Sequence, residues 1–223
     1  GYRYLDVRAG WNGTGWYAHH AEVGVPVTDI LHDVHTFMQE HPGEVVVMQV
    51  SHLDGFPDAT QVTELQNAID TILGQYAAGP SWAKGTAFGD LNIGAMVDSG
   101  RRLAVVFGDG DYAGKSSETH HADESFAKSK TKIAWPPQVL RNAYADADDP
   151  NVVMKYVRGK VVTFNNSTQT ETMSKISWTL TAQAKTVLGM FEPGTQPRSL
   201  RELTERSRPA FGAFAQEVVQ SGC

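Results

Sequence analysis

Side chains capable of acid–base chemistry lie close together near the start of the chain. Residues 4–8 alternate polar and apolar side chains, which predicts a half-buried strand. The same alternation places the carboxylate of Asp6 and the guanidinium of Arg8 on one face. His19 and His20 follow after a glycine-rich turn. A cation, a carboxylate and imidazoles at a strand end are typical of the rim of an active site, although a structural ion pair and surface histidines fit the same pattern.

Further polar residues follow apolar runs. Ser51 and His52 come directly after residues 45–50, Val-Val-Val-Met-Gln-Val, a run typical of a strand buried on both faces. Asn166 follows residues 160–164, which we also interpret as a strand. The position of His52 favours neither a functional nor a structural role.

The rest of the chain alternates predicted helices with predicted strands, which favours a parallel α/β architecture. Apolar residues at helical spacing and short apolar runs mark the elements. We expect helices at 27–40, 62–76, 91–97 and 200–219, and strands at 45–50, 103–107, 160–164 and 178–182. The first helix has Thr28 or Asp29 as its N-cap and ends at His41. Residues 111–155 are polar and form a long excursion that is helical in part, around 137–144.

Composition limits the class of protein. With 223 residues, the chain fits one domain, 1–223, and the net charge of −6 argues against nucleic acid as a partner. No run of about 18 apolar residues occurs, so we expect no transmembrane segment. The single cysteine, Cys223, allows no internal disulfide and suggests neither a thiolate metal site nor a thiol nucleophile.

Several motifs, taken in order, resemble one enzyme family. The chain has Arg-Tyr-Leu-Asp-Val-Arg at 3–8, then His19-His20, an amphipathic helix, and Glu-His-Pro-Gly-Glu-Val-Val-Val-Met at 40–48. Looser motifs follow in sequence: Gly-Arg-Arg-Leu-Ala-Val-Val-Phe, Arg-Gly-Lys-Val-Val-Thr-Phe-Asn-Asn and Ser-Trp-Thr-Leu-Thr. The pattern resembles the catalytic X-type domain of phosphatidylinositol-specific phospholipase C in its bacterial-like form. The resemblance implies a TIM-like (β/α) barrel with its active site at the carboxyl ends of the strands.

The resemblance also implies roles for the residues at the start of the chain. His20 matches the general acid that protonates the leaving diacylglycerol oxygen, and His19 is its adjacent alternative. Arg8 matches the arginine that neutralises the phosphate in the metal-free bacterial enzymes, so neither a metal nor a cofactor is expected. Asp6 matches an acidic residue that orients the catalytic groups. Ser51 stands where family members often have lysine or glutamate.

For the substrate head group, we expect contacts from His19, Ser51, His52 and Asn166. The substrate is then a phosphatidylinositol-type phospholipid at a membrane interface, cleaved to a cyclic inositol phosphate and diacylglycerol. The resemblance further implies that the first barrel strand, with the general-base histidine, lies before Gly1, and that the last strand is also missing. We expect a secreted monomer.

Two other functions remain open on the sequence. A related phosphodiesterase could act on another phospholipid or on a glycerophosphodiester. Alternatively, a catalytically silent barrel could bind lipid or sugar, since Ser51 departs from the family pattern. Barrel folds host many chemistries, so the architecture is better determined than the substrate.

Overall fold

The structure is a computed structural model that describes residues 3–20, 22–55, 57–108, 133–165, 172–178, 180, 183 and 199–220. The chain divides into two compact units, one of Gly1–Arg141 with Thr170–Met173 and the other of Asn142–Gln169 with Ser174–Cys223. Each unit is described by itself, and the single domain remains a prediction. None of the described helices is both long and apolar enough to cross a membrane.

A six-stranded sheet forms the centre of the first unit, with the strand order β3-β2-β1-β4-β5-β6. Strands β1, β4, β5 and β6 run parallel, whereas β2 and β3 join the edge of β1 as an antiparallel hairpin. The bounds are β1 (Tyr4–Trp11), β2 (Trp16–His20), β3 (Glu22–Pro26), β4 (Val46–Asp54), β5 (Leu103–Phe107) and β6 (Ala134–Trp135). The mixed α/β class is therefore confirmed, while a closed barrel remains a prediction because pairing among the described strands runs from β3 to β6 without joining these ends.

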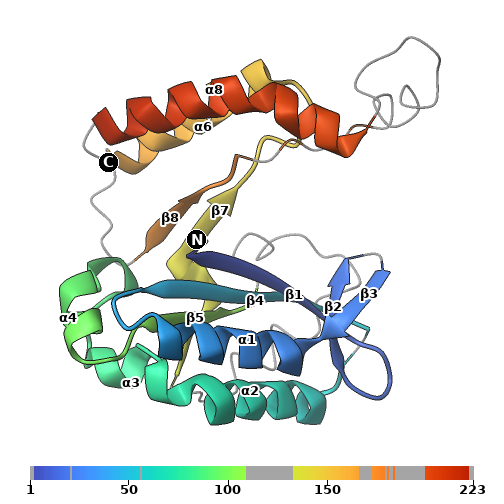
Figure 1. Ribbon diagram of the computed structural model, residues 1–223, viewed down its shortest axis with the longest axis vertical. Coiled ribbons are helices and arrows are strands. Elements are labelled where there is room, and N and C mark those ends of the chain that lie inside the picture. Colours follow the sequence, from blue (N-terminus) through green and yellow to red (C-terminus); the bar gives the residue numbers. More distant parts are fainter. Residues whose placement is uncertain are drawn as a thin grey trace. The chain divides into compact units, whose positions relative to one another are not determined.

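Two long helices cover one face of this sheet (Figure 1). They are α1 (Val27–Glu40) and α2 (Ala59–Leu73). One core cluster joins them to alternate residues of β1, β4 and β5, among them Val7, Met48 and Val105. Intervening residues of the same strands must face the other way. Asp6, Gln49 and Ser51 therefore lie on the sheet face opposite α1 and α2.

The second core cluster lies on that opposite face, toward the amino ends of the strands. It contains Ala104 and Val106 of β5 with Phe88, Met96 and Trp135. The indole Nε1 of Trp135 donates a hydrogen bond to the Ala78 carbonyl. Short elements contribute to this cluster: α3 (Pro80–Ala83), α4 (Ile93–Asp98) and the 3₁₀ turns η2 (Phe88–Asp90) and η4 (Pro137–Val139). The 3₁₀ turn η1 (Gly74–Tyr76) instead packs Tyr76 against the first cluster. The apolar packing covers this part of the face and leaves the polar residues near the carboxyl ends.

The helix expected at 27–40 is confirmed, but its predicted cap is wrong. Pro26 is the N-cap, with φ −54° and no side-chain hydrogen bond, so neither Thr28 nor Asp29 caps the helix. The proline ring restricts φ to a value that suits the entry into a helix, and Asp29 lies in the first turn. His41 ends the helix as expected.

The strand at 103–107 forms as predicted, and the helices expected at 62–76, 91–97 and 200–219 also form, with ends shifted by a few residues.

The second unit corrects one strand prediction. Residues 160–164 belong to α6 (Pro150–Asn165) and not to a strand. Val153 and Val157, one helical turn apart, are buried against Phe214 of α8 (Leu200–Gln220). The β-branched run Val-Val-Thr is helical here because packing of this face outweighs local strand propensity. Asn166, the residue expected to follow that strand, lies outside the described residues.

The remaining predictions for the later chain are partly met. A small sheet pairs β7 (Leu140–Ala143) with β8 (Met173–Ile176), so residues expected to be helical around 137–144 form the turn η4 and then a strand. In the expected strand at 178–182, Leu180 forms an isolated bridge with Ala147. The predicted excursion at 111–155 lies partly outside the described residues.

Candidate active site

Asp6 and Arg8 form the core of the candidate site on β1. Their side chains are two residues apart on one face, as the alternation predicted, and Arg8 Nε lies 3.6 Å from Asp6 Oδ2. Both side chains keep about a third of their surface exposed, 37% for Arg8 and 33% for Asp6. A cation held by a carboxylate at an accessible strand end can receive an anionic group from solvent.

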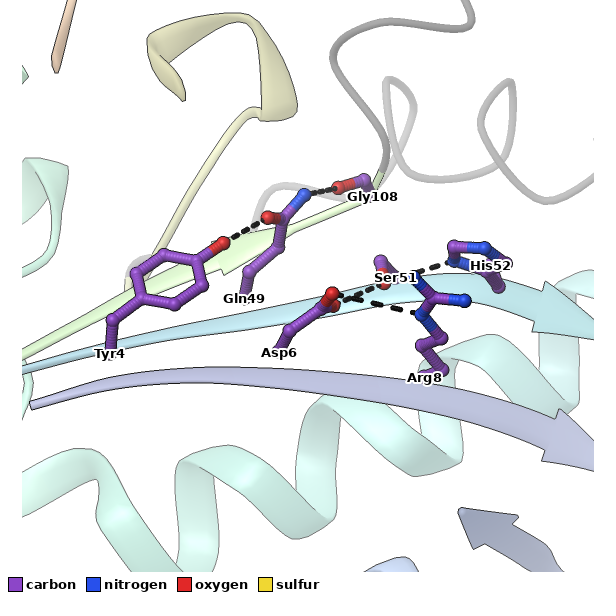
Figure 2. A network of polar contacts seen from close by, with 7 residues as sticks. All are labelled: Tyr4, Asp6, Arg8, Gln49, Ser51, His52 and Gly108. Atoms are coloured by element: carbon purple, nitrogen blue, oxygen red, sulfur yellow. Dashed lines mark hydrogen bonds and ion pairs between the residues drawn. The ribbon is translucent and has the colours of Figure 1, made fainter. Parts of the chain in front are cut away.

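Strand β4 supports Asp6 from the side. Ser51 is paired with Arg8 in the parallel register, is only 1% exposed, and donates its hydroxyl proton to Asp6 Oδ1 at 3.0 Å. The same hydroxyl oxygen lies 3.1 Å from His52 Nδ1 (Figure 2). Arg8, Asp6, Ser51 and His52 therefore form a continuous polar chain across two strands. The Ser51 hydroxyl is buried and bonded to Asp6, so it supports this carboxylate, and a contact of Ser51 with a substrate remains a prediction.

A second polar chain, which we did not predict, links β1 and β4 to the residue that follows β5. The Tyr4 hydroxyl donates to Gln49 Oε1, and Gln49 Nε2 donates to the Gly108 carbonyl at 3.0 Å (Figure 2). Gln49 is 4% exposed, so these bonds satisfy an amide that would otherwise be costly to bury. The sequence signal for this buried polar contact was Gln49 itself, a single polar residue within the apolar run of β4.

The end of β4 carries an irregularity that redirects its side chains. His52 and Leu53 have φ values of 71° and 48°, a left-handed conformation that is uncommon for residues other than glycine. At this point the register changes, with Arg8 paired to Ser51 and Gly10 paired to Asp54. Two steps along β1 thus match three steps along β4, which is a β-bulge. The bulge brings Asp54 level with Gly10.

His19 reaches Asp54 across β1. Its Nδ1 atom lies 3.0 Å from Asp54 Oδ2, and both side chains are under a third exposed. The imidazole lies over Gly10, where an added Cβ would come within 2.8 Å of His19 Cβ. We did not predict Asp54, and no sequence signal indicated it, because its position depends on the bulge.

The two adjacent histidines of β2 face opposite sides of the sheet. Trp16 of the same strand packs against the core cluster of α1 and α2 and donates its Nε1 proton to the Gln61 carbonyl of α2. His20 is four residues after Trp16 and therefore lies on the same face of the strand, whereas His19 is three residues after Trp16 and lies on the opposite face. His20 therefore points to the helix side and is exposed at the strand end, where it pairs with Glu22 of β3.

One cavity of about 580 Å³ connects these groups along the edge of β1. Asp6, Arg8, His19 and His20 all line it, together with other residues of β1 and β2 and residues of β3 and α1. The structure thus collects four of the predicted residues around one space and joins Ser51 and His52 to them through hydrogen bonds. Among the described residues, no three His, Cys, Asp or Glu side chains converge as a metal site would require.

Comparisons with known proteins address the fold. No protein-family model matches the chain, and no curated protein matches it. Among solved structures, a phosphatidylinositol-specific phospholipase C from Listeria monocytogenes aligns over 99% of this chain and 69% of its own, with a TM-score of 0.58 and 11% identity. A Ca²⁺-dependent phosphatidylinositol-specific phospholipase C from Streptomyces antibioticus aligns over 67% of this chain, with a TM-score of 0.42 and 17% identity.

The chain covers 62% of the length of the Streptomyces enzyme. The Listeria alignment shows that the fold is similar to that of a phosphatidylinositol-specific phospholipase C. At this level of identity, the likeness concerns the fold, and the activity has to be argued from the site.

Proposed function

We propose that the protein is a phosphodiesterase that cleaves a phosphatidylinositol-type phospholipid. The observation that carries this proposal is the position of Arg8, which is held by Asp6 in a cavity that two histidines also line. The likeness of the fold to a phospholipase C supports it. The proposal includes a membrane interface as the place of action, secretion and a monomeric state.

Arg8 would bind the phosphodiester and stabilise the transition state. Asp6 contacts its Nε, and no described residue pairs with its two terminal nitrogens. A planar guanidinium can offer two parallel N–H donors to phosphate oxygens, and its charge offsets the charge that accumulates on them. Asp6 holds the side chain in place, and Ser51 holds Asp6.

A histidine of β2 would supply the proton for the leaving group. The inositol 2-hydroxyl attacks phosphorus, a base takes the hydroxyl proton, and the bond from phosphorus to the diacylglycerol oxygen breaks. A histidinium gives its proton to that oxygen, so that the products are a cyclic inositol phosphate and diacylglycerol. His52 and Asn166 remain proposed contacts of the head group.

The test is an assay of phosphatidylinositol vesicles, with cyclic inositol phosphate detected by ³¹P NMR in excess chelator and, separately, with added Ca²⁺. We expect cyclic phosphate from the wild type and a loss of about 100-fold or more in Arg8→Lys, because an ammonium lacks the planar fork of donors. Arg101→Lys is the matched control, since Arg101 bonds the Gly74 carbonyl away from the cavity.

Three results would contradict the proposal. Turnover of glycerophosphodiesters without turnover of phosphatidylinositol would indicate the related phosphodiesterase. Binding of vesicles without any product would indicate a silent barrel. Full activity in Arg8→Lys would rule out the proposed role of Arg8 in binding the phosphodiester and stabilising the transition state.

A further inference from the structure

We propose that His19 is the residue that protonates the leaving group, and that Asp54 and Gly10 are its positioning residues. This inference rests on the proposed function and deepens it. It also departs from the sequence resemblance, which favoured His20 and left His19 as the adjacent alternative.

The first argument is the face on which each histidine lies. The antiparallel register pairs Ala9 with Ala18 and Gly10 with Tyr17, so alternation along β2 sets His19 on the same sheet face as Tyr17, Gly10 and Arg8. Directly opposed residues of an antiparallel pair have neighbouring side chains on the same face. His19 therefore lies on the sheet face of Arg8 and lines the same cavity, whereas His20 lies on the side of the helices.

The second argument is the carboxylate behind the ring. Asp54 Oδ2 lies 3.0 Å from Nδ1 of His19, a distance at which Nδ1–H donates to the carboxylate. A carboxylate on Nδ1 fixes the orientation of the ring and stabilises the imidazolium, so that Nε2 becomes the atom that exchanges a proton. Among the described residues, no side chain holds the imidazole of His20 in this way.

The third argument is the space that β1 leaves for the ring. The imidazole has to cross β1 to reach β4, and Gly10 is the residue beneath it. A Cβ at this position would approach His19 Cβ to 2.8 Å and Cγ to 2.9 Å, closer than real side chains tolerate. The β-bulge at His52 and Leu53 then brings Asp54 level with Gly10 to receive the ring.

The chemical step is balanced within this arrangement. The new bond from the inositol hydroxyl oxygen to phosphorus forms as the bond to the glyceryl oxygen breaks. The proton on Nε2 of the His19 imidazolium moves to the glyceryl oxygen, and the hydroxyl proton leaves to a base, water in the simplest case. His19 ends neutral and Asp54 remains a carboxylate throughout.

Two substrates with different leaving groups test the inference. Phosphatidylinositol releases an alkoxide that needs a proton, whereas inositol 4-nitrophenyl phosphate releases a phenolate that is stable without one. We expect His19→Ala to lose about 100-fold or more on the lipid and less than about 10-fold on the nitrophenyl ester, because general-acid catalysis matters only for the poor leaving group. Asp54→Asn shows the same selectivity with a smaller loss, and Asp54→Glu recovers part of it.

Control variants separate this role from general damage. His32→Ala, a substitution of an exposed histidine on α1, leaves both rates unchanged. His20→Ala changes both rates by one common factor. Circular dichroism confirms that each variant folds, and ¹⁵N NMR of the imidazole detects the Nδ1–H bond of His19 and its loss in Asp54→Asn.

The outcomes distinguish the two proposals. If the wild type hydrolyses neither substrate, the proposed function fails. If the wild type is active but His19→Ala loses the same factor on both substrates, or if His20→Ala shows the selective loss instead, the assignment of His19 is overturned and the proposed function stands.

Discussion

At the scale of single residues, the site depends on which groups neighbour each charge. Asp6 accepts a hydrogen bond from a buried hydroxyl on one oxygen and faces a guanidinium with the other. A carboxylate held in this manner has little freedom to rotate, so the cation beside it is also positioned. The cavity therefore presents Arg8 in a prepared orientation, which is a condition for electrostatic stabilisation of a transition state.

Gly10 provides a residue-scale prediction. In Gly10→Ala, the new Cβ lies within 2.8 Å of His19 Cβ, so the imidazole has to move away from Asp54. We expect a loss of about 10- to 100-fold in turnover of phosphatidylinositol and a smaller loss on the nitrophenyl ester, because a small displacement of a catalytic group is costly. Gly43→Ala is the control, since no atom lies within 4 Å of the added Cβ there. Unchanged kinetics in Gly10→Ala would show that the ring does not need this space.

The ion pair of Arg3 and Glu44 predicts a dependence of stability on pH. The hydrogen bond from Arg3 lowers the pKa of the Glu44 carboxyl below its ordinary value of 4.5. A lowered pKa in the folded state stabilises the fold above the unfolded value, and the contribution disappears as the pH falls through the folded value. Glu44→Gln should therefore be slightly less stable than the wild type at neutral pH and equally stable in strong acid.

Urea denaturation at a series of pH values measures this difference. Glu40→Gln, at an exposed position at the end of α1, is the matched control and should show no such trend. A deficit of Glu44→Gln that persists unchanged into strong acid would contradict the prediction, because Glu44 of the wild type is then protonated.

At the scale of elements, local sequence signals determine where the helices begin. Helix α2 has a complete capping box: Asp58 accepts a hydrogen bond from the Gln61 backbone at 2.9 Å, and the Gln61 side chain accepts one from the Asp58 backbone at 2.7 Å. These two bonds satisfy donors that the first turn of a helix leaves unpaired. The helix carries Leu65 and Ile69 into the core beneath the sheet.

Removing the Asp58 side chain tests how much the N-terminal cap of α2 stabilises the fold. We expect Asp58→Ala to lower the free energy of unfolding by about 0.5–2 kcal/mol, because no side chain then accepts from the Gln61 backbone. Asp58→Asn keeps an acceptor and should lose much less. Thermal and urea denaturation measure both, and equal losses in the two variants would mean that charge, and not the cap bond, is responsible.

Elements with a regular pattern were predictable, and those that depend on tertiary contacts were not. The helix at 27–40 was predicted because Leu31, Val34 and Met38 recur at helical spacing, and all are buried. The hairpin of β2 and β3 was not predicted, because β3 is largely exposed and lacks a clear apolar face. The run at 160–164 has strand propensity but is helical, because its neighbours pack against α8.

At the scale of the whole molecule, the buried Arg102 joins distant parts of the first unit. It is 5% exposed and donates to three carbonyls, those of Met38 at 2.7 Å, His41 at 2.8 Å and Glu44 at 3.1 Å. Two of these carbonyls belong to the last turn of α1 and its cap, where helical partners are lacking. Arg102 thus connects the end of α1, the turn before β4 and the start of β5.

Removing this cation should affect the stability of the unit as a whole. We expect Arg102→Met to lower the free energy of unfolding by about 3–5 kcal/mol, since three carbonyls, one of them in a fully buried bond, lose charge-assisted hydrogen bonds. Arg101→Met is the matched control: Arg101 is partly exposed and makes one such bond, so its loss should be far smaller. Urea denaturation followed by circular dichroism checks both. Similar losses in the two variants would show that the buried network contributes little.

The sequence by itself determined which groups β1 presents, because strand alternation puts Asp6 and Arg8 on one face regardless of context. It also determined the buried strands β4 and β5, whose continuous apolar runs suit a sheet covered on both faces. Only the tertiary structure decided which of the two histidines shares their face of the sheet. His19 meets Asp54 through a strand pairing and a β-bulge that bring together residues 35 positions apart. Such contacts arise from register and backbone irregularity, which local residue patterns do not specify.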